Sequence, residues 1–223
     1  MIGSLVGKIV GVLRQQGARG FARRMLSSIR RLPRSEFDLK RGTETGDIVP
    51  LWRLRIASPN ARFGVRYQAV DEQDVVAAVG SLNEDIGRFT FIDLGCGKGR
   101  GLLVAVELGF GRVLGVEFAP QLAETARANL QKTGAANALV IAVDAAEYVF
   151  PAGNLVVFLY NPFGAEVMRP VIANLRRSDS RSLYVIYVRP VHAALFDEAD
   201  FLEPLGSPAG RPNIQIWRRR AGR

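Results

Sequence analysis

The amino-acid sequence predicts an α/β fold in which helices cover both faces of a doubly wound, mainly parallel sheet. From about residue 71 onward, short apolar runs alternate with segments of helical periodicity, which is the pattern of successive β-α-β units. The runs are nearly continuous in apolar side chains, as is typical of strands buried on both faces. The first run ends in a glycine-rich turn that leads directly into a helix, an arrangement that places ligand sites at strand ends.

The predicted elements follow one another in a regular order. A helix over 71–80 begins with an acidic first turn. Strands are predicted at 89–94, 112–117, 138–143, 154–160 and 182–188. Further helices are predicted near 100–109, 120–133, 164–177 and 191–199. Two final runs, 201–205 and 213–218, flank a segment rich in glycine and proline and predict an antiparallel hairpin.

The first 70 residues do not follow this alternation. Residues 1–35 space their apolar side chains as a helix does and carry eight basic side chains and no acidic one, which predicts a basic amphipathic helix. Such a helix could pack on its own domain, lie on an anionic lipid surface or act as a targeting segment. Residues 36–70 are rich in proline, glycine, threonine and arginine and predict an irregular segment that leads into a domain of residues 71–223.

Composition and charge disfavour several classes of protein. Hydrophobic residues make up 48% of the chain, yet no apolar run reaches the roughly 18 residues that span a bilayer. The single cysteine, Cys96, excludes an intramolecular disulfide and fits a reducing compartment. Of the 30 basic side chains, eight lie before residue 36 and four after residue 217, whereas all 21 acidic ones lie between. The net charge of +9 therefore belongs to the two ends, and a body that binds nucleic acid through its overall charge is not indicated.

The most specific pattern in the chain is the turn after the first predicted strand. Gly95, Gly97 and Gly99 permit a left-handed backbone and let a ligand approach the main chain without meeting a Cβ. Their spacing differs from the G-x-G-x-x-G pattern of dinucleotide-binding folds, because position 100 is arginine. Asp93 lies two residues before the first glycine. Its carboxylate would repel a pyrophosphate but suits a ligand that carries an amine or hydroxyl groups.

Two further acids lie at the ends of the next two predicted strands. Glu117 ends the second strand, 24 residues after Asp93, where a carboxylate can accept both hydroxyls of a ribose. Asp144 ends the third strand and is followed by Ala145, where an adenine edge would be read. Taken singly, Glu117 could be a solvated strand end and Asp144 could cap the next helix. The joint spacing of acids across three strand ends predicts a nucleoside site.

Other polar residues near these strands have plainer interpretations. Cys96 is expected to fill the turn as a small side chain rather than to act as a nucleophile. Lys98 and Arg100 are expected to face solvent at the start of the helix. His192, the only histidine, is expected to have a structural role or none, with general-base catalysis as the alternative. No clustered set of metal ligands stands out, so no metal site is predicted.

The glycine turn and the acids together resemble the motifs of a known superfamily. Asp93-Leu94-Gly95-Cys96-Gly97-Lys98-Gly99 is similar to the first motif of the class I, seven-stranded S-adenosylmethionine-dependent methyltransferases, and Glu117 and Asp144 resemble the second and third motifs. The resemblance covers about residues 65–218. It implies a Rossmann-like sheet in the order 3-2-1-4-5-7-6, with strand 7 antiparallel, and S-adenosylmethionine as the cofactor.

The resemblance also implies which residues would bind the cofactor. Gly95 and Gly97 would hold the methionine part, Glu117 the ribose and Asp144 the adenine amine. The segment before the domain covers the cofactor in many enzymes of this fold, so Tyr67 would either close over the methionine end or belong to a packed linker. The expected cofactor-binding residues are Tyr67, Asp93, Gly95, Cys96, Gly97, Gly99, Glu117, Phe118, Asp144, Ala145 and Asn161.

The turn Tyr160-Asn161-Pro162-Phe163-Gly164 follows the fourth predicted strand, across the cleft from the glycine turn. An amide oxygen and a proline-fixed carbonyl can align an N–H donor with a methyl–sulfur bond, so Tyr160, Asn161 and Pro162 are the expected catalytic residues. The turn resembles the Asn-Pro-Pro-aromatic motif of amino-group methyltransferases, but Phe163 replaces the second proline. This departure weakens the case for a planar amide or a nucleobase as the methyl acceptor. An amine, including a lysine side chain, is about as plausible an acceptor. The alternative is a strand end with Phe163 in the core.

The expected function is S-adenosylmethionine-dependent N-methylation of a protein amine of the lysine type, or of a small-molecule amine, in the cytoplasm. Peripheral contact with the inner membrane face would follow only if residues 1–35 bind lipid. Two alternatives stay open: an NAD(P)-dependent oxidoreductase on a similar sheet, and a non-catalytic module recruited through residues 1–35. Nucleic acid is disfavoured as a substrate because the body is mildly acidic. The sequence does not indicate the oligomeric state.

Overall fold

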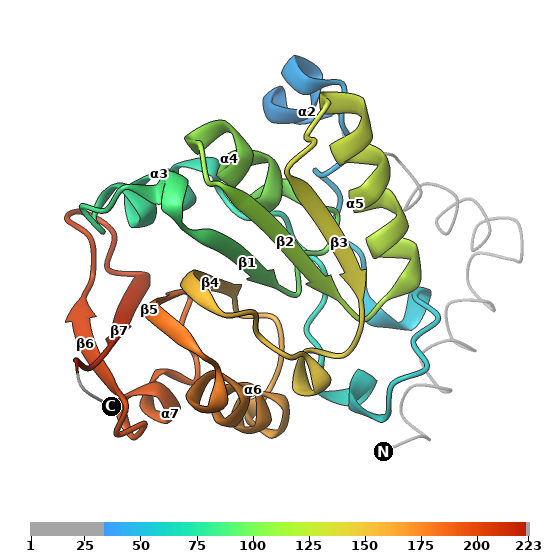
Figure 1. Ribbon diagram of the computed structural model, residues 1–223. Helices are drawn as coiled ribbons and strands as arrows, with labels where there is room; N and C mark the ends of the chain where they lie inside the picture. The colour runs from blue at the N-terminus through green and yellow to red at the C-terminus, as the bar shows by residue number, and fades with distance from the viewer. Residues whose placement is uncertain (1–33, 222–223) are drawn as a thin grey trace, which may run out of the picture. The chain divides into compact units, whose positions relative to one another are not determined.

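Seven strands form one mixed sheet in the order β3-β2-β1-β4-β5-β7-β6 (Figure 1). In this computed structural model, which describes residues 34–221, β1 to β5 run parallel and β7 runs antiparallel to both of its neighbours. The predicted strand order and the predicted reversed strand are both confirmed. The strands are β1 (Thr90–Leu94), β2 (Arg112–Glu117), β3 (Ala138–Ala142), β4 (Gly153–Tyr160), β5 (Ser180–Val188), β6 (Leu202–Gly206) and β7 (Ile214–Arg219).

Helices cover both faces of the sheet (Figure 1). One face carries α3 (Glu72–Gly80), α4 (Arg100–Leu108) and α5 (Pro120–Thr133). The other carries α6 (Ala165–Arg177), α7 (Ala193–Asp197) and the 3-10 turn η4 (Ala145–Glu147). Helix α7 is shorter than the predicted 191–199, because the residue before it, His192, has a non-helical backbone with φ −112° and ψ 33°.

Successive side chains of the central strands pack on opposite faces. Phe91 in β1 and Phe158 in β4 pack with α3, α4 and α5, whereas Ile92 and Leu159 pack with α6 and α7. All four side chains are at most 1% exposed. Because side chains alternate between the two faces of a strand, a strand covered on both faces must be apolar throughout. This is the physical cause of the nearly continuous apolar runs in the sequence.

Residues 36–70 are more regular than the sequence predicted. They contain helix α2 (Glu36–Arg41) and two 3-10 turns, η1 (Leu51–Arg53) and η2 (Pro59–Phe63). The expectation of an irregular stretch was wrong for these pieces, because caps and contacts with distant parts of the chain stabilise helices this short. Residues 43–68 form the lid segment, which packs over the carboxyl ends of the strands.

Contacts group Ser35–Arg223 into one compact unit. The predicted basic helix of residues 1–35 lies almost wholly outside the described residues and stays a prediction. Within residues 34–221, no helix combines the length and the hydropathy needed to cross a membrane.

Candidate cofactor and acceptor site

The glycine turn joins the end of β1 to the start of α4. Its three glycines have left-handed backbones, with φ of 77° at Gly95, 55° at Gly97 and 86° at Gly99. A Cβ on Gly95 would lie 2.5 Å from the Cβ of Pro162, and a Cβ on Gly97 would lie 2.2 Å from the ring of Tyr67. Both the backbone conformation and the available space therefore require glycine at Gly95 and Gly97.

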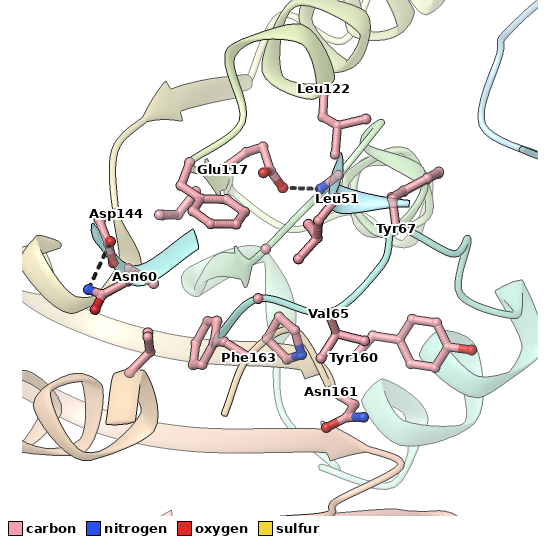
Figure 2. Close-up of a pocket in the computed structure, with 18 of the residues that line it drawn as sticks. Leu51, Asn60, Val65, Tyr67, Glu117, Leu122, Asp144, Tyr160, Asn161 and Phe163 are labelled. Atoms are coloured by element: carbon pink, nitrogen blue, oxygen red, sulfur yellow. Dashed lines mark hydrogen bonds between the residues drawn. The ribbon is translucent and has the colours of Figure 1, made fainter. Parts of the chain in front are cut away.

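Glu117 holds the glycine turn in place from the end of β2. Its side chain is buried, and its Oε2 accepts from the N–H of Gly97 at 2.8 Å (Figure 2). Its Oε1 accepts from the N–H of Ala119 at 2.9 Å. A carboxylate has about four acceptor positions, and backbone N–H groups occupy part of them here. The buried, hydrogen-bonded Glu117 is therefore not a solvated strand end.

Asp93 and Glu117 bring two carboxyl groups into a poorly solvated region. Asp93 faces a small cavity beside the glycine turn. Burial, and then the charge of Glu117, raise the pKa of Asp93 to about 8. Burial also raises the pKa of Glu117 to about 7, against the opposing effect of the backbone N–H groups that it accepts. Two interacting buried carboxyl groups favour a positively charged ligand, because such a charge stabilises their ionised forms.

Asp144 lies at the opposite end of the pocket from Tyr67 (Figure 2). Its Oδ1 accepts from the N–H of Ala146 at 2.9 Å and caps η4. This capping role is one of the two interpretations that the sequence allowed for Asp144. Its Oδ2 accepts from the hydroxyl of Ser58 and from Nδ2 of Asn60 at 3.0 Å. The capping role does not remove Asp144 from the pocket, because both Asp144 and Asn60 line it.

The turn after β4 is joined to the lid segment. The N–H of Val65 donates to the carbonyl of Pro162 at 3.0 Å. Asn161 has a left-handed backbone with φ 41°, and its Oδ1 accepts from the hydroxyl of Tyr187 at 3.2 Å. The side chain of Phe163 is buried in the core beneath α6. The Pro162 carbonyl is therefore partly engaged already, and Phe163 has the core position that the structural interpretation of this turn predicted.

These groups surround a pocket of about 70 Å³ under the lid segment (Figure 2). The expected site residues that line it are Tyr67, Gly95, Gly97, Glu117, Phe118, Asp144, Ala145, Tyr160, Asn161 and Pro162. Asp93 and Cys96 line the small cavity beside it. Gly99 lines neither space, because it packs against Ala126 of α5.

Comparison with known proteins relates this chain to methyltransferases. Residues 91–178 match the protein family described as "Methyltransferase domain". A ribosomal protein L11 methyltransferase of Dechloromonas aromatica is 32% identical over 111 residues, which are 46% of this chain and 36% of that protein. The chain therefore spans only about a third of the length of this curated relative.

Two solved structures show the same fold. The mitomycin 7-O-methyltransferase MmcR has a TM-score of 0.54 and 21% identity, over 90% of this chain and 67% of that chain. The 23S rRNA methyltransferase ErmE has a TM-score of 0.51 and 16% identity, over 68% and 69%. The chain has the fold of the class I S-adenosylmethionine-dependent methyltransferases.

Within this methyltransferase fold, two residues whose positions the sequence misjudged fasten the lid segment and the helix before it. Lys98 is 5% exposed, and its Nζ lies 3.0 Å from a carboxylate oxygen of Asp47 and 3.3 Å from one of Glu44. Arg100 lies with its Nη2 3.5 Å from a carboxylate oxygen of the buried Asp38. The expectation that Lys98 and Arg100 face solvent was wrong, because the chain before the methyltransferase domain covers the start of α4.

Tyr67 is the lid residue that contacts the glycine turn. Its ring lies against Gly97, and its hydroxyl donates to the carbonyl of Thr45 at 2.7 Å. Burial raises the pKa of Tyr67 well above its usual range, so the hydroxyl stays neutral. Cys96 is also buried, and its Sγ would lie 2.7 Å from a Cβ on Gly115, which agrees with a small side chain that fills the turn.

Several residues that line this pocket were not among the predicted site residues. The missed lining residues are Leu51, Asn60, Gly64, Val65, Arg66, Gln68, Leu122, Val143, Phe163 and Val167. Most of them belong to the lid segment, which has no periodicity, and only the folded chain brings them to the strand ends. His192 lines neither this pocket nor the cavity beside it.

Proposed function

We propose that this protein is an S-adenosylmethionine-dependent methyltransferase whose acceptor is an amine. The observation that carries the proposal is the pair of buried carboxyl groups, Asp93 and Glu117, beside a glycine turn in a domain that matches methyltransferases. S-adenosylmethionine has a sulfonium and an α-amino group, and positive charge favours ionised carboxyl groups. The pyrophosphate of a nicotinamide dinucleotide would instead place negative charge near Asp93, which argues against the oxidoreductase alternative.

The polar groups that line the pocket suit this cofactor, but the pocket is too small to hold it unless part of the chain moves. The methionine part would lie along Gly95 and Gly97, against which Pro162 and Tyr67 pack in this structure. The carboxylate of Glu117 can accept from a ribose hydroxyl, and Asp144 and Asn60 lie at the proposed adenine end. Pockets for ligands of this size measure roughly 300–1,000 Å³, whereas this pocket measures about 70 Å³. We infer that the lid segment moves outward when the cofactor binds.

The acceptor is proposed to approach at the turn after β4. When bound, S-adenosylmethionine supplies the methyl group, and this chain aligns the acceptor and excludes water. Asn161 can accept an N–H while Tyr187 holds its amide, and the ring of Tyr160 can pack against the acceptor. Burial raises the pKa of Tyr160, so its hydroxyl remains a neutral donor near neutral pH.

The source of the amine is a protein, with a lysine side chain as the first candidate, or a small molecule. Similarity to a ribosomal protein L11 methyltransferase supports a protein acceptor. The likeness to ErmE extends to the fold alone and carries no argument for RNA. Incubation with radiolabelled S-adenosylmethionine and separated cell fractions would distinguish labelled protein from labelled small molecules.

Calorimetric titration with S-adenosylhomocysteine tests the cofactor assignment. We expect micromolar affinity for the wild-type chain and no measurable binding by Glu117→Ala, because the ribose hydroxyls lose their acceptor. Glu117→Gln keeps the volume and one acceptor oxygen and should lose less. Glu124→Ala, which removes an exposed carboxylate from α5, is the matched control.

Two further measurements complete this test. Thermal unfolding of each variant is needed because Glu117→Ala also leaves the N–H groups of Gly97 and Ala119 without their acceptor. A parallel titration with NADH checks the oxidoreductase alternative. Failure of the wild-type chain to bind S-adenosylhomocysteine, or tighter binding of NADH, would overturn the proposal.

A further inference from the structure

The pocket of about 70 Å³ under the lid segment is called the cofactor pocket below. A second hollow, of about 450 Å³, lies beside it and has a much larger volume. The hollow shares six of its seven lining residues with that pocket, Arg66 among them, and adds Arg189. Figure 2 shows two of the shared residues, Tyr160 and Asn161, at the pocket's edge. The lid segment contributes Arg66 and Gln68 to its wall, and the residue after β5, Arg189, contributes the rest of its charge. The hollow therefore adjoins the residues proposed to align the methyl acceptor.

The charge in this hollow is positive and is not neutralised. Within residues 34–221, no carboxylate oxygen lies within 4.0 Å of a side-chain nitrogen of Arg66 or Arg189. Two acids are near enough to affect Tyr160, but both are engaged: Asp74 pairs with Arg211 at 2.8 Å, and Asp71 caps α3. The two arginines are thus available to a ligand.

Backbone strain independently marks the same hollow. Among the described residues, the non-glycine residues with a left-handed backbone are Asn83, Asn161 and Arg189. The last two directly follow β4 and β5, with φ of 41° and 53°, and both line the hollow. Asparagine adopts this conformation fairly often, whereas a long side chain such as arginine rarely does. Residues held in such conformations cluster at functional sites.

The surroundings of Arg189 hold it in this conformation. Its backbone N–H donates to the carbonyl of Asn213, in the segment before β7, at 2.7 Å. Its guanidinium carbon lies 5.2 Å from the centre of the Tyr160 ring. The arginine is therefore positioned against a proposed acceptor-binding aromatic, with its N–H donors free to bind a further group.

We propose that this hollow binds the methyl acceptor through an oxyanion, a phosphate or carboxylate that the acceptor itself carries, held between Arg66 and Arg189. The inference rests on the proposed function and narrows its substrate class. Guanidinium groups bind oxyanions through charge-assisted hydrogen bonds, often in pairs. An acceptor that carries only positive charge, such as a polyamine, would be repelled by both arginines.

The test uses the full chain saturated with S-adenosylhomocysteine, so that the carboxylate of this ligand already occupies its own place when the anions are added. Inorganic phosphate and succinate are titrated as probes, and their comparison separates a phosphate from a carboxylate site. Putrescine is the cationic comparison. We expect one of the two anions to bind and putrescine not to bind.

The variants identify the residues responsible. Arg66→Gln and Arg189→Gln should each weaken the binding of that anion by about tenfold, the effect of one lost charge-assisted hydrogen bond. Arg189→Lys should retain part of the affinity because it keeps the charge. Arg62→Gln, in the same lid segment but outside the hollow, is the matched control and should not change it.

The outcomes separate this inference from the proposed function. If S-adenosylhomocysteine binds but neither anion binds at millimolar concentration, the oxyanion site is refuted while the methyltransferase proposal stands. The oxyanion site is likewise refuted if the anion binds only before S-adenosylhomocysteine is added, since the arginines would then serve the cofactor. Unchanged anion binding by Arg66→Gln and Arg189→Gln would also refute it. If S-adenosylhomocysteine itself does not bind, the proposed function fails first.

Discussion

At the scale of single residues, the chemistry of this site depends on two carboxyl groups that fold into a region with little solvent. The pKa of Asp93 is about 8 and that of Glu117 about 7, both far above the values of exposed carboxyl groups. Near neutral pH the ligand-free protein therefore retains protons on this pair. A cationic ligand stabilises the ionised forms, so its binding should release protons.

The affinity for S-adenosylmethionine should accordingly rise as the pH increases through about 7 and 8, the pKa values of the pair. Asp93→Asn should weaken binding at high pH and flatten this dependence. Calorimetry in buffers of different ionisation enthalpy measures both the affinity and the protons released. An affinity that is independent of pH in the wild-type chain would contradict the role given to Asp93.

The same shifts affect stability with a definite sign. The folded state keeps these protons at pH values where the unfolded chain has lost them, so ligand-free stability should fall as the pH rises from the ordinary carboxyl range up to about 8. The slope is at most about 1.4 kcal/mol per pH unit for each group. Asp93→Asn should remove the contribution of Asp93 to this pH dependence. Urea unfolding at several pH values measures the free energy of unfolding for both proteins.

At the scale of elements, the lid segment decides access to the site. It is fastened near its start by the ion pairs of Lys98 with Glu44 and Asp47, and near its end by the hydrogen bond from Val65 to the carbonyl of Pro162. Between these points it leaves a pocket of about 70 Å³. Binding of a nucleoside-sized ligand must therefore disturb contacts of the lid segment, and the rate of binding should depend on them.

Tyr67→Ala should speed both association and dissociation of S-adenosylhomocysteine, because it removes the ring that lies on Gly97. Tyr67→Phe keeps the ring and loses only the hydrogen bond to Thr45, so it should have the smaller effect. Stopped-flow fluorescence can follow the reaction through Trp52, which lies in η1 of the lid segment and is 76% exposed. Trp52→Phe should abolish the signal. Equal rates for Tyr67→Ala and the wild-type chain would show that the lid segment does not limit access.

At the scale of the whole molecule, the terminal hairpin completes the sheet and its second core. Trp217 in β7 is fully buried, stacks on Phe196 with ring centres 5.0 Å apart, and donates from Nε1 to Asp197 at 2.8 Å. Nearby, Arg218 and Arg219 belong to β7 rather than to a free basic tail. Arg218 pairs with a carboxylate of the opposite strand, and Arg219 donates to carbonyls at the end of α6. Their charge is therefore part of the domain.

Trp217→Phe should lower the free energy of unfolding by about 1–3 kcal/mol, because it loses a hydrogen bond and leaves part of a buried volume unfilled. The affinity for S-adenosylhomocysteine should stay unchanged, since Trp217 lines neither the cofactor pocket nor the cavity beside it. Urea unfolding and calorimetry measure the two effects. A loss of affinity without a loss of stability would show that the hairpin acts on the site.

The sequence by itself determined the strands, the glycine turn and the acids at three strand ends, because these depend on local periodicity and on contiguous residues. Tertiary structure alone decided that Lys98 is buried and that Arg100 pairs with Asp38. It also decided that Val65 engages the Pro162 carbonyl and that Arg66 and Arg189 line one hollow. These contacts join residues that are far apart in the chain, and no local pattern encodes such distances. The turns η1 and η2 of the lid segment could not be predicted for the same reason, because contacts with distant parts of the chain stabilise them.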